Sequence, residues 1–87
     1  MERFTIRNND GLVSVPESKQ IAAWQQLAAF EDAYQELTLS HSQTVLQLEE
    51  LRTAGKTKTA RYRELLSLKL LSNNAIQLFE RHGLHAE

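Results

Sequence analysis

Few residues in this chain have types and spacings that could do chemistry, and the first to consider surround Gly55. Gly55-Lys56-Thr57 matches the end of a P-loop, in which backbone N–H groups cradle a phosphate. That loop also needs a glycine five positions earlier, where this chain has Glu50, and a preceding strand, where it has a helical pattern. Because the phosphate-binding turn is missing, we predict no nucleotide site.

The histidines suggest a metal site at first. His82 and His85 lie near Glu80, but Gly83 is expected to end a helix between them, and His41 is distant in the sequence. Zinc sites use three or four converging ligands, so we predict no metal ion or cofactor. A catalytic site needs a nucleophile, a base and an orienting group around a pocket. We find no such set, and therefore predict no catalytic residues and no enzyme activity.

Positive charge is concentrated in one segment. Residues 52–69 hold six basic side chains and one acidic side chain, whereas residues 1–51 hold three basic and eight acidic ones. One interpretation, which we favour, is that these halves attract one another within a hairpin or between subunits. The other is a nucleic-acid contact through lysine and arginine, although the net charge of −1 disfavours a dedicated module. The candidate contact residues are Arg52, Lys56, Lys58, Arg61 and Arg63.

The elements that would position these residues begin with an N-terminal arm, residues 1–16. Two β-prone runs, Phe4–Arg7 and Leu12–Val15, flank the turn-forming segment 8–11, so we predict a β-hairpin. Two strands alone are marginal, so the hairpin must lie on a helix of its own chain or pair with another chain. Pro16 then ends strand pairing and suits a helix start.

A helical hairpin is predicted over residues 17–83, followed by a tail, residues 84–87. Apolar residues recur at spacings of three and four, and Gly55 and Gly83 suit helix C-termini. The first helix either runs from about residue 17 to 54 or breaks near Ser40, and we slightly favour one continuous helix. The second runs from about Thr59 to His82, with a possible bend at residues 72–74.

The second helix is apolar around most of its circumference, which one neighbouring helix cannot cover. A chain of 87 residues without cysteine has a marginal core, and association is the usual remedy. We therefore predict a mainly α fold, an antiparallel long-helix hairpin that forms an oligomeric, coiled-coil-like helical bundle as a homodimer or higher homo-oligomer. The candidate self-association residues are Tyr62, Leu65, Leu66, Leu68, Leu71 and Phe79.

The N-terminal sequence also resembles a known group. MERFTIRNNDG followed by LAAFED, within Met1–Asp32, is similar to small phage and prophage proteins of Gram-positive bacteria that carry MERxTxRNxxG and LAAYED-like segments. Phe30 stands where that pattern has Tyr, and Ala33-Tyr34-Gln35 replaces the Thr-Gly-Leu that would end the helix. The resemblance implies a phage-associated setting in a bacterial cytoplasm. It transfers no functional residue.

These observations predict a non-enzymatic interaction protein that acts as a homo-oligomer. The alternative is a nucleic-acid-binding accessory protein that uses the basic turn, residues 52–63. An adaptor or inhibitor of an unidentified protein would share the leading architecture. No apolar run approaches the roughly 20 residues of a membrane span, so we expect no membrane segment and a cytoplasmic location.

Overall fold

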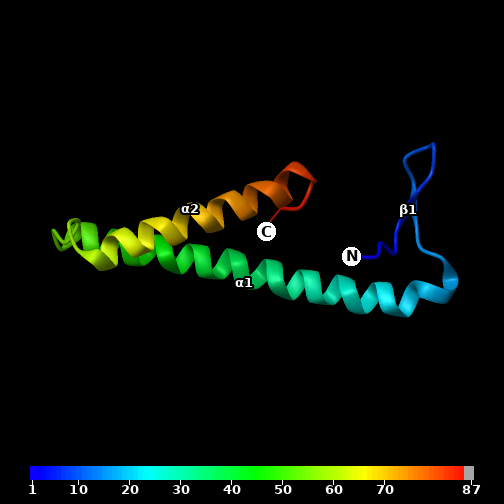
Figure 1. Ribbon diagram of the computed structural model, residues 1–87, viewed down its shortest axis with the longest axis horizontal. Helices are drawn as coiled ribbons and strands as arrows, with labels where there is room; N and C mark the ends of the chain where they lie inside the picture. The colour runs from blue at the N-terminus through cyan, green and yellow to red at the C-terminus, as the bar shows by residue number, and fades with distance from the viewer. Residues whose placement is uncertain (86–87) are drawn as a thin grey trace. The chain divides into compact units, whose positions relative to one another are not determined.

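Two helices joined by a short turn form most of the chain, and a small β-hairpin precedes them (Figure 1). The computed structural model describes residues 1–85; the last two residues of the predicted tail lie outside the described part. The order is β1 (Ile6–Arg7), β2 (Val13–Ser14), a 3-10 helix η1 (Glu17–Lys19), α1 (Gln20–Thr53) and α2 (Ala60–Arg81). The predicted helical hairpin and N-terminal β-hairpin are confirmed. The oligomeric bundle stays a prediction. The chain divides into two compact units, Met1–Ala33 and Tyr34–Glu87.

The β-hairpin of the first unit is held by its loop. β1 and β2 are antiparallel, with Arg7 opposite Val13. The side-chain oxygen of Asn8 accepts hydrogen bonds from the backbone N–H groups of Asp10 at 3.0 Å and Leu12 at 2.9 Å. Gly11 has φ +81°, a conformation that side-chain-bearing residues rarely adopt. The strands are shorter than the predicted runs, because only the pairs next to the loop keep ladder geometry.

The first residues of the arm lie against α1 of the same chain. Phe4 is half-buried and shares a shallow hollow of about 370 Å³ with Ala23, Leu27 and Phe30 of α1. Lys19 donates from Nζ to Oε1 of Glu2 at 2.9 Å. This hydrogen bond and the lysine charge lower the pKa of the Glu2 carboxyl from its usual 4.5. The residues before β1 therefore contact α1, whereas the residues of β1 and β2 are exposed.

The first helix is continuous through Ser40, which confirms the first of the two alternatives. Hydroxyl groups that could have interrupted it are bonded within it: Thr38 donates to the carbonyl of Gln35 at 3.1 Å, Ser42 to that of Thr38 at 3.1 Å, and Thr44 to that of Ser40 at 3.0 Å. Hydroxyl groups that could compete for backbone hydrogen bonds therefore donate to carbonyl groups of the preceding helical turn. α2 likewise passes through residues 72–74 without interruption.

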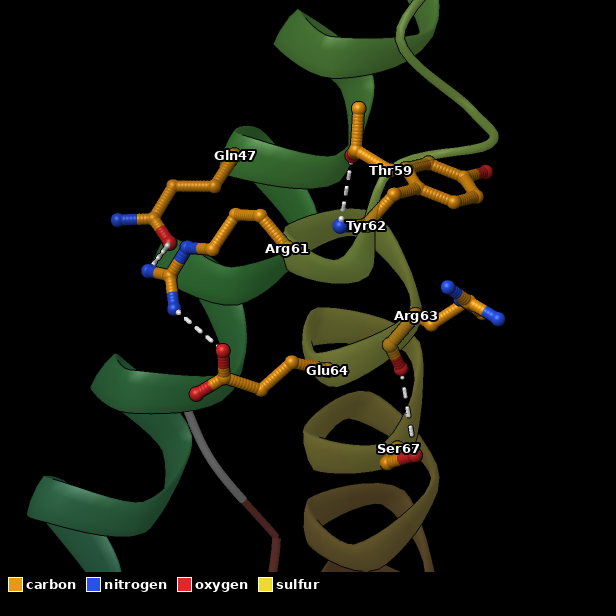
Figure 2. Close-up of polar contacts among 7 residues, drawn as sticks. All are labelled: Gln47, Thr59, Arg61, Tyr62, Arg63, Glu64 and Ser67. Carbon is orange, nitrogen blue, oxygen red and sulfur yellow. Dashed lines mark hydrogen bonds and ion pairs between the residues drawn. The ribbon is translucent and has the colours of Figure 1, made fainter.

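The turn between the helices has a closed pattern of backbone hydrogen bonds. The N–H of Lys56 donates to the carbonyl of Leu51 at 2.8 Å, and that of Gly55 to the carbonyl of Arg52 at 3.0 Å. With Gly55 at φ +72°, this is the Schellman motif, which ends a helix on a left-handed glycine. Thr59 then caps α2 by accepting from the N–H of Tyr62 at 3.2 Å (Figure 2).

Within the second unit, α2 packs on α1 along one narrow stripe of each helix. The most buried side chains are Leu65 at 2% exposure, Leu48 at 3%, and Tyr62, with Leu51 partly buried beside them. This cluster adjoins the turn. Less exposed positions continue from it at alternating spacings of three and four. They are Tyr34, Leu37, His41 and Thr44 on α1, and Lys69, Ser72, Ile76 and Phe79 on α2.

Candidate interaction surface

The stripe that joins α1 to α2 is partly polar, which limits how firmly it can hold the hairpin. Nδ1 of His41 lies 2.6 Å from Oγ of Ser72, which also donates to the carbonyl of Lys69 at 3.1 Å. Beyond this pair, the rings of Tyr34 and Phe79 meet edge to face with centroids 5.1 Å apart. The apolar contact between the helices is therefore concentrated at the turn and at this aromatic pair.

The structure separates the six candidate self-association residues into two groups. Tyr62 and Leu65 belong to the buried cluster, and Phe79 is half-buried against Tyr34. These three side chains hold the hairpin itself together. The others, Leu66, Leu68 and Leu71, are exposed. They are the members of the set that remain available to a second chain.

Two further exposed leucines of α2, Leu70 and Leu78, were not among the candidates. Leu70 is 64% exposed and Leu71 is 68% exposed, although they are neighbours in the sequence. Successive helical residues point about 100° apart, so these two leucines face different directions. Leu78 lies seven positions after Leu71, on the same face of the helix. A search for a second three–four repeat in α2 would have found it.

A hollow of about 250 Å³ lies between the helices beside these leucines. Its walls include Leu68, Leu71 and Ala75 of α2 and, from α1, the short side chains of Ser40 and Thr44. A small side chain opposite a large one leaves space that another large side chain can fill. This part of the second unit therefore combines exposed apolar surface with a concave site.

Exposed apolar side chains also occur on α1. They are mostly large, and several exceed half exposure. The set is Ile21, Trp24, Leu27, Phe30, Leu39, Val45 and Leu46. Together with the leucines of α2 they outnumber the buried apolar residues of the described chain, Leu48, Tyr62 and Leu65. The described chain therefore leaves most of its large apolar side chains accessible to another chain.

Two cations of the basic turn are engaged in contacts within the hairpin. Arg52 lies 3.2 Å from a carboxylate oxygen of Glu49 and 3.4 Å from the hydroxyl of Tyr62, and the hydrogen bond to Tyr62 raises the pKa of Arg52. Arg61 lies 3.3 Å from Glu64 and 3.5 Å from Oε1 of Gln47 on the facing helix (Figure 2). These two arginines therefore serve the hairpin, in part, as intramolecular charge partners.

The other three cations make no ion pair within residues 1–85. Lys56 and Lys58 lie in the turn, and the side chain of Arg63 points away from α1 in Figure 2. Because they are exposed and unpaired within this part of the chain, they are the members of the basic set best placed to meet an external anion.

The described chain has neither a phosphate-binding loop at Gly55 nor a metal site at the histidines. The N–H groups of Gly55 and Lys56 are bonded to carbonyls of α1, so they do not point into a phosphate-binding cradle. Across residues 1–85, no three histidine or acidic side chains gather as metal ligands. Among the same residues, neither helix is long and apolar enough to cross a membrane.

No protein-family model, curated protein or solved structure matches this chain.

Proposed function

We propose that this protein is a non-enzymatic helical interaction protein that acts as a homo-oligomer. The observation that supports it is the imbalance between its buried and exposed apolar residues. Leu48, Tyr62 and Leu65 are the buried apolar side chains of the described chain, whereas leucines on several faces of both helices are exposed. A single pair of helices cannot cover these faces, and a second copy can cover one more of them.

The energetics favour the same proposal. Full burial of a large apolar side chain contributes roughly 1.5–3 kcal/mol, so three such residues give a small part of what an independent domain needs. Small chains usually obtain the remainder from disulfides, metals or association. The sequence has no cysteine, which excludes disulfides. Association of identical hairpins supplies additional burial without any other component.

Light scattering after gel filtration tests this proposal. We expect a molar mass at least twice that of the 10.0 kDa chain at micromolar concentration. Dilution should reduce the mass, since oligomer populations depend on protomer concentration. A folded chain that stays monomeric from micromolar to near-millimolar concentration would overturn the proposal.

A second function, binding of nucleic acid as an accessory protein, is supported by Lys56, Lys58 and Arg63, which are exposed and unpaired within residues 1–85. We expect weak binding to duplex or single-stranded nucleic acid at low salt, weakened as salt rises. The variant Lys56→Glu/Lys58→Glu should abolish it. The matched control Arg3→Glu/Arg7→Glu, with the same charge change in the N-terminal arm, should retain most of the affinity. Equal loss in both variants would indicate a net-charge effect and reject the turn as the contact.

The setting we propose is a bacterial cytoplasm, in an accessory role encoded by a phage or prophage. The support is the resemblance of Met1–Asp32 to small proteins of that kind. In that setting a homo-oligomer with exposed leucines could also engage an unidentified protein as an adaptor or inhibitor. Co-purification of another protein from phage-infected cells, in stoichiometric amount and absent from a tag-only control, would distinguish this role from self-association alone.

A further inference from the structure

α2 carries a second stripe of residues with coiled-coil spacing, separate from the stripe that packs on α1. Leu68, Leu71, Ala75 and Leu78 follow one another at intervals of three, four and three. This is the repeat that lets two helices pack knobs into holes along their length. The first stripe of α2 is already covered, because it packs on α1. The second stripe has no occupant within the described chain, because Leu68 and Leu78 are nearly half exposed and Leu71 is 68% exposed.

The surface beside this stripe has the shape that a knob requires. The hollow of about 250 Å³ adjoins Leu68, Leu71 and Ala75, and Ser40 and Thr44 of α1 form its other wall. Ala75 interrupts the leucines with a side chain of one carbon. An opposing leucine can therefore approach closely at this point, where a leucine at position 75 would exclude it.

We propose that this stripe binds the same stripe of a second copy, with the two α2 helices antiparallel about a two-fold axis. The inference rests on the proposed homo-oligomer and names its interface. A two-fold contact is self-complementary: if one residue of the first copy contacts a second residue of the other copy, the same two residues also meet with the copies exchanged. With the axis between Leu71 and Ala75, Leu71 of each copy faces Ala75 of the other, and Leu68 faces Leu78. Large residues then meet small ones at the centre, and leucines meet at the flanks.

The ends of the stripe supply the argument for the antiparallel direction. Glu64, which also lies 3.3 Å from Arg61, comes four residues before Leu68, and His82 comes four residues after Leu78, so both continue the same repeat. Antiparallel pairing places each Glu64 beside His82 of the second copy, where an imidazole N–H can donate to the carboxylate. Parallel pairing would instead bring the two Glu64 carboxylates together, which is unfavourable. The end residues therefore select one of the two directions.

Leu70 and Leu71 provide a matched pair of variants to test the interface. Their exposures are 64% and 68%, they are adjacent in α2, and they face different directions. We expect Leu71→Glu to raise the dissociation constant of the homo-oligomer at least ~100-fold, since each contact would bury a charge. Leu70→Glu should change it by no more than ~3-fold, because exposed rim substitutions matter little. Far-ultraviolet circular dichroism of both variants checks that the hairpin is still helical.

Cysteine cross-linking tests the direction with the leucines intact. The natural chain has no cysteine, so Glu64→Cys and His82→Cys each introduce one thiol. In the antiparallel arrangement, oxidation of a mixture with a glutathione redox buffer should give mainly the disulfide between the two variants. Each variant alone should cross-link poorly, because 18 residues of helix separate the two positions by ~27 Å. Efficient cross-linking of Glu64→Cys to itself would overturn the antiparallel arrangement.

The outcomes separate this inference from the proposed function. A monomeric wild-type chain would reject both. A wild-type oligomer that survives Leu71→Glu, or that dissociates equally with Leu70→Glu, would reject this interface and leave the homo-oligomer standing. Dissociation by Leu71→Glu alone, together with the mixed disulfide, would establish it.

Discussion

The substitution Leu65→Ala gives the sharpest test of what holds the helical hairpin together. Leu65 is 2% exposed and lies in the buried cluster with Leu48 and Tyr62. Removing a buried leucine costs the lost transfer free energy and a term for the cavity that remains, about 2–5 kcal/mol in all. Here the cluster is one layer deep, so neighbouring side chains and water can reach the vacated space. We therefore expect the lower part of that range, about 2–3 kcal/mol.

Urea denaturation followed by circular dichroism at 222 nm measures this loss. Both proteins must be compared at one protein concentration, because association adds to the apparent free energy of unfolding. For a small domain with a slope of roughly 1 kcal/mol per molar urea, the midpoint should fall by about 2 M or more. So large a shift would leave the variant partly unfolded in the absence of denaturant if the wild-type stability is only a few kcal/mol.

The matched control is Leu70→Ala, which removes the same atoms from a side chain that is 64% exposed on the same helix. We expect it to change the free energy of unfolding by no more than about 0.5 kcal/mol. If Leu65→Ala is as mild as this control, the buried cluster does not stabilise the hairpin as argued. If Leu70→Ala is as costly as Leu65→Ala, Leu70 is covered in the folded assembly.

Three further predictions concern the cap, the polar pair and the arm. Thr59→Ala should destabilise the fold by about 1 kcal/mol in the same assay, because the N–H of Tyr62 loses its partner, whereas Thr59→Ser should retain most of the stability. Ser72→Ala should cost about 1 kcal/mol by leaving His41 unpaired, and His41→Leu with Ser72→Ala should recover it, which a double-mutant cycle measures. Since the pKa of Glu2 is lowered in the folded chain, its ion pair should persist above pH 4.5 and be lost as the pH falls through that lowered value. Amide chemical shifts of residues 2–6 should report this transition, and Lys19→Gln should remove it.

Much of the fold could be predicted from local sequence. Gly55 and Gly83 identified both helix ends because few other residues accept a left-handed conformation, and both lie at positive φ. The continuity of α1 was harder to predict. Thr38, Ser42 and Thr44 have low helix propensity, yet each bonds its hydroxyl to the preceding turn of the helix. Whether such groups bond inward or compete with the backbone is decided by geometry that the sequence does not display.

The candidate surface was predictable in part. The excess of leucine in α2 predicts that more than one face must be covered. However, the candidate self-association set divides in the structure: Tyr62 and Leu65 are buried between the helices, while Leu66 is exposed. One neighbouring helix covers a narrow strip, and its exact direction depends on how two helices pack rather than on either sequence alone. The pairing of Arg52 with Tyr62, which withdraws one cation from the basic turn, has the same origin.

The position of the buried cluster has a consequence for how the hairpin assembles. Leu48, Leu51, Tyr62 and Leu65 flank the turn closely, so bringing them together closes only a short loop. Short loops have a low closure entropy and form within about a microsecond. We expect folding to begin at the Gly55 turn and to spread outward, through the His41–Ser72 pair, to Tyr34 and Phe79. The same order in reverse makes the aromatic end the first part of the hairpin to open, so the helices should fray there while the turn is still closed.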